Sequence, residues 1–338
     1  MDAPLWTETN APTLAELPQE GIREYLTRAS EEPINLALYG PKGAGKTAAV
    51  RALAREAHDS ENDLVEINVA DFFSMTKKEL SEDPRFSPFI TPKRRRGTSK
   101  AGLINHVLKE SASYPPVSGD YKTILLDNAE AIREDFQQAL RRVMEQHHEA
   151  AQFVITTRQP SALIAPIVSR CFPVPVRAPT TDETVGILER IAEREGIEYD
   201  AEGIEYVASY ADGDLRKAVL GAQTVAEADE EITMEAAYEA LGEVGIDDRV
   251  EDMLVNAEKG EFIDARKLLD ELLIDEGYDG GEVLADVLSV SRSRYGGDEL
   301  VDIHRRAGEI DMDLTEGTSD RIQLGQLLAE LGAERSTV

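Results

Sequence analysis

The stretch with the clearest capacity for chemistry is a glycine-rich loop with the sequence GPKGAGKT, from Gly40 to Thr47. Gly40, Gly43 and Gly45 allow the loop to turn its backbone N–H groups toward phosphate oxygens, which a β-carbon would obstruct. Lys46 would neutralise the β- and γ-phosphates and Thr47 would bind Mg²⁺, while the N-terminus of the following helix would add its positive end. The loop lies between a predicted strand and a predicted helix, and it therefore predicts nucleotide binding.

A second candidate site is the stretch TILLDNAEAI, from Thr123 to Ile132. Asp127 ends a predicted strand, where an ATPase with such a loop places the carboxylate that holds Mg²⁺; alternatively, Asp127 caps a helix. The next residue is Asn128, whose amide cannot accept a proton from water. Glu130 is expected to project from the following turn and not to replace a catalytic base. The stretch leaves open whether the chain hydrolyses ATP.

The elements that would position these residues follow from apolar periodicity. Short apolar runs alternate with amphipathic segments in the first half, which predicts a parallel sheet with flanking helices. After Pro179 the pattern is helical and no further strand is predicted. From about Asp247 onward the segments remain helical but are broken by glycines. We predict an α/β domain over residues 1–178, a helical domain over 179–242 and an all-helical unit over 243–338. The predicted strands are 34–40, 63–69, 123–127, 153–157 and 171–176.

The segment from Asp71 to Tyr121 is punctuated by five prolines and contains the basic run KRRR at Lys93–Arg96. It is predicted to be a surface excursion with one helix. The basic run is interpreted either as a contact with DNA or a partner, or as a solvated loop.

Composition limits the environment in which the chain works. The 338 residues carry a formal net charge of −30, with acids spread along the whole sequence and 11 lysines against 25 arginines. This pattern favours a halophilic protein, with an ordinary acidic protein as the alternative. The one cysteine excludes an internal disulfide. No stretch approaches the roughly 18 apolar residues of a membrane span, and we expect a cytoplasmic protein without a membrane partner.

Several motifs together resemble the clamp-loader branch of the AAA+ ATPases, specifically the small subunit of archaeal replication factor C. PLWTETNAPTLAELP resembles that family's W-x-E-K-Y-R-P opening box, and EINVAD resembles its L-N-A-S-D strand end. QQALRRVMEQ is similar to the family's central helix, SRC to its signature tripeptide and GDLRKAV to the sensor-two helix of its lid. The resemblance covers about residues 4–225 and implies a P-loop AAA+ domain, a helical lid and a helical collar for oligomerisation.

The resemblance implies a ring-shaped heteropentamer that opens the PCNA sliding clamp and places it on primer–template DNA. Its partners would be the large and the other small replication factor C subunits, with ATP and Mg²⁺ at subunit boundaries. Arg216 would reach the nucleotide from the lid, and Arg170 would act in trans as an arginine finger at the neighbour's site. A finger in trans supplies charge to the γ-phosphate only when two subunits close. Without the resemblance, Arg170 would be interpreted as part of a surface salt bridge.

Three positions depart from the family's pattern. Asn128 replaces the Walker-B glutamate, Arg158 takes the place of the sensor-one asparagine, and Asn10-Ala11 replaces the Tyr-Arg of the opening box. The first two positions normally orient or activate the attacking water, and loss of a general base costs roughly 10²–10⁴ in rate. We predict a divergent small subunit with a degenerate ATP site of its own and an intact Arg170.

The acidic balance means that contacts with DNA must be local. Arg141 and Arg142 are candidates for phosphate contact or for relaying between sites, with an intersubunit salt bridge by one of them as the alternative. Two other functions stay open: a non-catalytic assembly subunit, and a different AAA+ machine that acts on origins or Holliday junctions. A Holliday-junction ATPase should end in a winged helix, for which the helical tail has no pattern.

Overall fold

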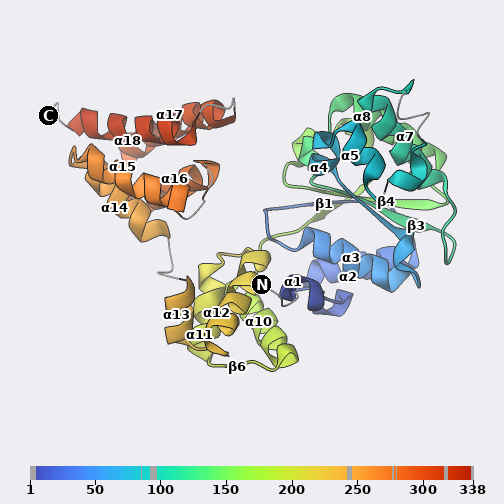
Figure 1. Ribbon diagram of the computed structural model, residues 1–338, viewed down its shortest axis with the longest axis horizontal. Helices are drawn as coiled ribbons and strands as arrows, with labels where there is room; N and C mark the ends of the chain where they lie inside the picture. The colour runs from blue at the N-terminus through green and yellow to red at the C-terminus, as the bar shows by residue number, and fades with distance from the viewer. Residues whose placement is uncertain are drawn as a thin grey trace. The chain divides into compact units, whose positions relative to one another are not determined.

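The computed structural model (Figure 1) describes residues 5–84, 86–91, 97–241, 246–275, 278, 280–315 and 319–335. Two compact units divide the chain, Met1–Leu241 and Gly242–Val338. The division into three parts at residues 178 and 242 stays a prediction. Lys93–Arg96 lies outside the described residues, and its role stays a prediction too.

The first unit contains a five-stranded parallel sheet in the order β2-β3-β4-β1-β5. Each strand lies where the sequence predicts one, with limits that differ by at most two residues. Because all strands run the same way, their carboxyl ends meet at one edge, where ligands bind in open α/β sheets. The predicted α/β class is confirmed. The strands are β1 (Leu36–Tyr39), β2 (Leu64–Asn68), β3 (Lys122–Asp127), β4 (Ala151–Thr157) and β5 (Phe172–Pro175).

Helices cover both faces of the sheet (Figure 1). Alternate residues of β4 point to opposite faces: Val154 joins the core beneath α2 and α3, whereas Phe153 and Ile155 join the core beneath α7 and α8. All three side chains are fully buried. A strand buried on both faces needs apolar residues on each face, which explains why residues 153–155 show no polar alternation. The flanking helices are α2 (Glu20–Glu31), α3 (Lys46–Ala57), α7 (Lys100–Ser113) and α8 (Glu134–Gln146).

The prediction that residues 71–121 form a surface excursion with one helix is wrong for the described residues. Before α7, the segment forms α4 (Val69–Ser74), α5 (Lys77–Glu82) and the 3₁₀ turn η3 (Ser87–Phe89). Phe72, Leu80 and Phe86 are fully buried in the same core as the residues of α7 and α8. Pro84 lies between α5 and η3, whereas Pro115 and Pro116 follow α7 in a largely exposed connection to β3.

After β5 the first unit continues as four helices, called the lid below. The sequence predicts helices over 181–195, 201–210, 215–227 and 234–241, which are nearly the observed limits. The prediction that no strand follows the sheet is wrong, because β6 (Glu198–Tyr199) pairs in parallel with β7 (Glu231–Ile232). Two-residue strands are too short to produce a periodic pattern. The lid helices are α10 (Thr181–Glu195), α11 (Ala201–Tyr210), α12 (Leu215–Asp229) and α13 (Met234–Leu241).

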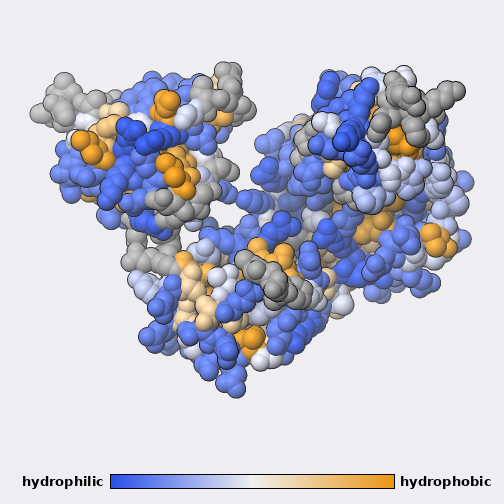
Figure 2. Space-filling view, viewed as in Figure 1, coloured by the Kyte–Doolittle hydropathy of each residue, from blue (hydrophilic) through white to orange (hydrophobic). Residues whose placement is uncertain are grey.

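The second unit is helical throughout its described residues and has its own apolar core. Among the described residues, no helix combines the length and the hydrophobicity that crossing a bilayer requires. Figure 2 shows a mostly hydrophilic face with apolar residues in small separate groups. The elements of the second unit are α14 (Ile246–Glu258), α15 (Phe262–Asp270), the π-helical turn η6 (Glu271–Asp275), α16 (Gly280–Arg294), α17 (Gly297–Thr315) and α18 (Asp320–Arg335).

Candidate nucleotide-binding site

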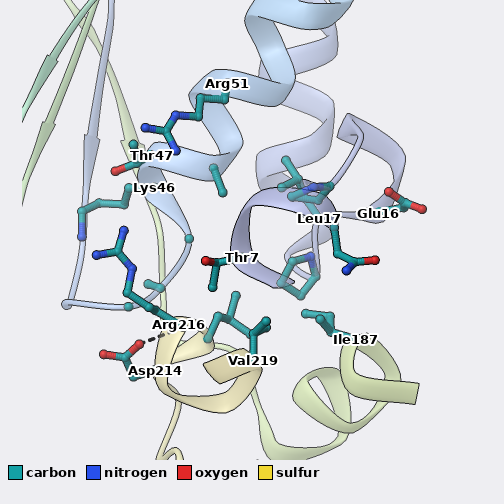
Figure 3. Close-up of a pocket in the computed structure, with 18 of the residues that line it drawn as sticks. Thr7, Glu16, Leu17, Lys46, Thr47, Arg51, Ile187, Asp214, Arg216 and Val219 are labelled. Atoms are coloured by element: carbon teal, nitrogen blue, oxygen red, sulfur yellow. Dashed lines mark hydrogen bonds between the residues drawn. The ribbon is translucent and has the colours of Figure 1, made fainter. Parts of the chain in front are cut away.

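A cavity of about 580 Å³ opens at the carboxyl edge of the sheet. Its walls come from the loop between β1 and α3, the N-terminal segment, and lid helices α10 and α12 (Figure 3). Leu17, Ile187 and Val219 form an apolar end, and Lys46 and Thr47 lie at the polar end. One apolar and one cationic end suit a ligand that joins an aromatic base to phosphates.

The glycine-rich loop is shaped by contacts with its own chain. A β-carbon on Gly40 would lie 1.8 Å from the carbonyl oxygen of Val176, and one on Gly43 would lie 2.2 Å from the carboxylate carbon of Asp214 in the lid. Gly43 also has a φ of 72°, which disfavours side chains. The Leu215 N–H donates to the Gly43 carbonyl at 3.0 Å, so that the loop and the start of α12 are joined directly.

Lys46 begins α3 and is half-buried in the cavity. Its ammonium donates to the carbonyls of Gly40 at 2.9 Å and Pro41 at 2.6 Å. Burial lowers the pKa of Lys46, and the negative charges of Glu130 and Asp127 act in the opposite direction. An incoming phosphate could replace the neutral carbonyls as the acceptor and would restore a full counter-charge to this ammonium.

Thr47 and Asp127, which the sequence analysis expects to bind Mg²⁺, contact each other in the cavity. The Thr47 hydroxyl donates to the two carboxylate oxygens of Asp127 at 2.9 and 3.1 Å, and the Thr156 hydroxyl donates to the same carboxylate. Hydroxyl and carboxylate oxygens are ligands that Mg²⁺ accepts, and this ion is commonly held by one or two protein groups together with phosphates. The described residues contain no cluster of three or more His, Cys, Asp or Glu side chains that could hold a metal alone.

Asn128 follows Asp127 in the left-handed region, with φ 55° and ψ 51°. Asparagine tolerates this conformation better than most residues. Its N–H donates to the Thr156 hydroxyl at 3.3 Å, and the residue lines the cavity. An amide therefore occupies the point where the chain turns into the cavity, one residue beyond Asp127.

Glu130 is the site residue whose position the sequence does not reveal. It is expected to project from the turn, but it lines the cavity together with Arg158. The Arg158 guanidinium donates through Nε to Glu130 Oε1 at 2.8 Å. Burial raises the pKa of Glu130, but hydrogen bonds from Arg158 and Thr157 outweigh this effect, and the pKa lies below its usual value. Spacing alone could not have found this pair, because Glu130 follows β3 and Arg158 follows β4, and the two strands become neighbours only in the fold.

Arg216 lies on α12 and also lines the cavity. Figure 3 shows its side chain pointing from the lid toward the loop that carries Lys46. The helix begins at Leu215 because the Asp214 carboxylate accepts from the N–H groups of Arg216 at 2.9 Å and Lys217 at 3.1 Å. The lid thus delivers one more cation to the phosphate end.

Arg170 does not line this cavity. It follows α9 (Ala165–Val168), and its guanidinium donates to the Pro166 carbonyl at 2.7 Å and to the carboxylate of Glu145. Arg141 pairs with the same carboxylate at 3.0 Å. Cys171 is buried, and burial raises the pKa of its thiol to about 12. The tripeptide therefore combines a core-anchored cysteine with a surface arginine, whose role stays a prediction.

The chain matches two protein-family models. Residues 36–176 match the ATPase family associated with various cellular activities, which indicates nucleotide binding, and residues 247–330 match the replication factor C C-terminal domain.

Similar solved structures are those of RuvB from Thermotoga maritima. A point mutant of that protein has a TM-score of 0.53 at 15% identity, covering 81% of this chain and 84% of that one. The structure described as the RuvB Holliday junction branch migration motor has a TM-score of 0.50 at 16% identity, covering 72% and 76%. These likenesses show the fold alone.

Curated relatives match at higher identity. The replication factor C small subunit of Methanocella arvoryzae is 35% identical, covering 89% of this chain and 88% of the relative. The proteins of the same name from Natronomonas pharaonis and Halobacterium salinarum are 31% and 30% identical, covering 98% and 92% of this chain and 96% and 89% of the relatives. With both family models in order along the chain, this protein belongs to the replication factor C small-subunit family.

Proposed function

We propose that this chain is a small subunit of the sliding-clamp loader that binds ATP and Mg²⁺ in the cavity at a boundary with another subunit. Together with large and small sibling subunits it would load the PCNA clamp onto primer–template DNA during replication. The observation that carries the proposal is the pairing of Thr47 with Asp127 beside Lys46, in a cavity closed by the lid. Membership of the replication factor C small-subunit family supports the assembly and the DNA substrate in this proposal.

Each group at the phosphate end has a role in this proposal. The backbone of the glycine-rich loop and Lys46 would bind the phosphates, and Arg216 would hold the lid against them. Thr47 and Asp127 would hold Mg²⁺, which neutralises charge on the phosphate oxygens when bound. Binding of nucleotide would thereby fix the lid relative to the sheet.

We further propose that this site holds ATP well and hydrolyses it slowly. Asn128 cannot take a proton from water, and no carboxylate replaces it at that position. Arg170 would instead serve the neighbouring subunit's site. Its carboxylate partner Glu145 is exposed and is shared with Arg141, which leaves the guanidinium able to exchange partners when a neighbour's γ-phosphate approaches.

The test measures ATP turnover of the reconstituted complex that contains all its sibling subunits. Asn128→Glu should raise turnover or leave it undiminished, although a glutamate in the left-handed region carries a strain of roughly 1 kcal/mol. Asn128→Gln extends the side chain without adding a carboxylate, and it should bring no gain. A large loss of turnover with Asn128→Glu but not with Asn128→Gln would contradict the degenerate site.

Arg170→Ala should abolish turnover at the neighbour's site, since an arginine finger contributes roughly 10³–10⁵ in rate. The matched control is Arg133→Ala, an exposed arginine at the start of α8 that lies outside the cavity and the tripeptide. If the two variants had equal turnover, Arg170 would not act as an arginine finger.

Asn128 also favours a second candidate, a non-catalytic assembly subunit in which nucleotide only stabilises the fold. Lys46→Ala separates the two, because full clamp loading by a complex with this variant would support the assembly role. Loss of loading, with the complex still assembled, would support a nucleotide-driven subunit. The likeness to RuvB is one of fold and adds no third candidate.

A further inference from the structure

Two cations at the polar end of the cavity are both bound to their own chain, but to different acceptors. Lys46 donates to two neutral carbonyls, whereas Arg158 donates to the carboxylate of Glu130. Hydrogen bonds between charged partners are about twice as strong as those between neutral partners. Releasing Arg158 therefore requires a ligand that offers comparable negative charge.

The sheet order places this pair beside the expected end of a triphosphate. β4 lies between β3, which ends at Asp127, and β1, which leads into the loop. Thr157 is in register with Tyr39, the last residue of β1. Arg158 follows Thr157 and so enters the cavity between the carboxylate expected to hold Mg²⁺ and the loop expected to hold the β-phosphate. The third phosphate of ATP would occupy that region, which ADP would leave free.

In the ion pair between Glu130 and Arg158, only the Arg158 guanidinium is free to move away. The Glu130 side chain is 13% exposed and the Arg158 side chain 55% exposed. Glu130 Oε2 accepts from the Thr157 hydroxyl at 3.1 Å and from the Arg158 N–H at 3.2 Å. Both of these donors would remain if the guanidinium departed. The buried carboxylate would therefore stay hydrogen-bonded, and the exposed guanidinium is the mobile member.

We propose that Glu130 and Arg158 form a latch that distinguishes ATP from ADP: the γ-phosphate takes the Arg158 guanidinium from Glu130, and ADP leaves the ion pair closed. The inference rests on the proposed function, because it requires adenine nucleotide in this cavity. Arg158 then contributes to triphosphate affinity, and Glu130 opposes it by competing for the same guanidinium. With this latch, the site would distinguish bound ATP from bound ADP even though Asn128 makes its hydrolysis of ATP slow.

The experiment measures equilibrium affinity in molar KCl with Mg²⁺ for two fluorescent ligands, an ADP analogue and a non-hydrolysable ATP analogue. It compares the wild-type chain with Arg158→Ala, Glu130→Gln and the double variant. Arg177→Ala is the matched control, since Arg177 is likewise 55% exposed and forms a bidentate pair with Glu183 outside the cavity. Circular dichroism and the unfolding midpoint check that each variant is folded.

Arg158→Ala should lower the preference for the ATP analogue over the ADP analogue about tenfold, the lower end for a hydrogen bond to a charged group. Glu130→Gln should raise that preference through tighter triphosphate binding, and the double variant should match Arg158→Ala. Arg177→Ala should leave the preference unchanged. Equal losses for both ligands in Arg158→Ala, or an effect of Glu130→Gln that persists without Arg158, would overturn the latch.

The controls separate this inference from the proposed function. If the wild-type chain and Lys46→Ala both fail to bind either analogue, the nucleotide site itself is wrong and the latch falls with it. If the wild-type chain binds both analogues and Lys46→Ala binds neither, but Arg158→Ala keeps the wild-type preference, the latch alone is overturned.

Discussion

Gly43 illustrates, at the scale of single residues, that a motif can be recognised for one reason and required for another. The motif assigns its glycines to phosphate binding, but in the structure Gly43 faces the carboxylate of Asp214 and has a φ of 72°. Asp214 in turn caps α12, which carries Arg216. The absence of a side chain at Gly43 therefore lets the lid approach the loop.

Gly43→Ala should loosen the lid and weaken nucleotide binding. A methyl group there would contact the Asp214 carboxylate and would also be strained by the positive φ. Together these effects should lower the free energy of unfolding by about 1–2 kcal/mol. Gly119→Ala is the matched control, since Gly119 has a φ of 70° but nothing within 4 Å of its added β-carbon. Urea unfolding and nucleotide titration would compare them. If Gly43→Ala and Gly119→Ala changed nucleotide affinity equally, the approach of Asp214 to Gly43 would have no role in nucleotide binding.

Asp63 provides a prediction with a defined pH dependence. Its buried carboxylate accepts from the N–H groups of Val117 at 2.6 Å and Ser118 at 2.8 Å, and from the Ser118 hydroxyl at 2.6 Å. Burial raises the pKa of Asp63, but these hydrogen bonds outweigh it, and the pKa falls below its usual 3.8. The stabilisation is therefore complete above about pH 4 and is lost as the pH falls through the lowered pKa.

Asp63→Asn should reduce the free energy of unfolding by about 2 kcal/mol near pH 7, because the amide NH₂ would face donors instead of accepting from them. Asp59→Asn, at an exposed position on the same connection, should change it by less than about 0.5 kcal/mol. Urea unfolding between pH 7 and pH 3 checks the sign. The gap between the wild-type chain and Asp63→Asn should narrow below pH 4, and a gap that widens there would contradict the assignment.

The residues predicted from sequence are those fixed by local spacing. Lys46 and Thr47 follow from the loop, and Asp127 follows from the end of an apolar strand, which the fold brings to the same edge. Glu130 and Arg158 could not be paired in advance, because their contact depends on β3 and β4 being neighbours in the sheet. Sequence periodicity identifies strands but does not give their order.

At the scale of elements, helix starts were predictable where a cap specifies them. α10 begins at Thr181 because Thr180 and Glu183 form a capping box, with hydrogen bonds of 2.8 and 3.2 Å. The burial of α4, α5 and η3 was not predictable, because proline spacing does not reveal which side chains reach the core. Elements with local signals were found, and those stabilised by tertiary packing were missed.

Gln137 on α8 joins three segments around the sheet edge. The residue is 2% exposed, its side-chain amide donates to the carbonyls of Ile132 at 3.2 Å and Ala162 at 2.9 Å, and its side-chain oxygen accepts from the Ile164 N–H at 2.7 Å. Ile164 directly precedes α9, the short helix before Arg170. One amide thus fixes the chain that leads to the proposed finger.

Gln137→Leu keeps the side-chain volume but leaves three buried or partly buried backbone groups without their partner. The free energy of unfolding should fall by about 3 kcal/mol, because each unpaired buried group costs about 1–3 kcal/mol and neighbouring groups relax in part. Gln138→Leu, at the exposed position next to it, is the matched control and should change stability by less than about 0.5 kcal/mol. Similar unfolding curves for the two variants would contradict this role of Gln137.

At the scale of the whole molecule, the net charge of −30 opposes folding by like-charge repulsion and should make stability depend on salt. The repulsion acts over about 10 Å at 0.1 M salt and about 3 Å at 1 M. Salt also weakens exposed ion pairs such as Arg177 with Glu183, but each of these contributes only about 0–1 kcal/mol. The excess of acids over bases, 66 against 36, decides the sign in favour of stabilisation by salt.

The unfolding midpoint in urea should therefore rise between 0.1 and 2 M KCl, and a variant with fewer acids should respond less. Replacing four exposed lid glutamates by glutamine, at 202, 205, 235 and 239, removes charge without disturbing a buried side chain. We expect this variant to be more stable than the wild-type chain in 0.1 M KCl and to converge with it at 2 M, where screening is nearly complete. If the midpoints of both proteins rose in parallel, salt would be acting through apolar burial, and the charge distribution would not explain the rise.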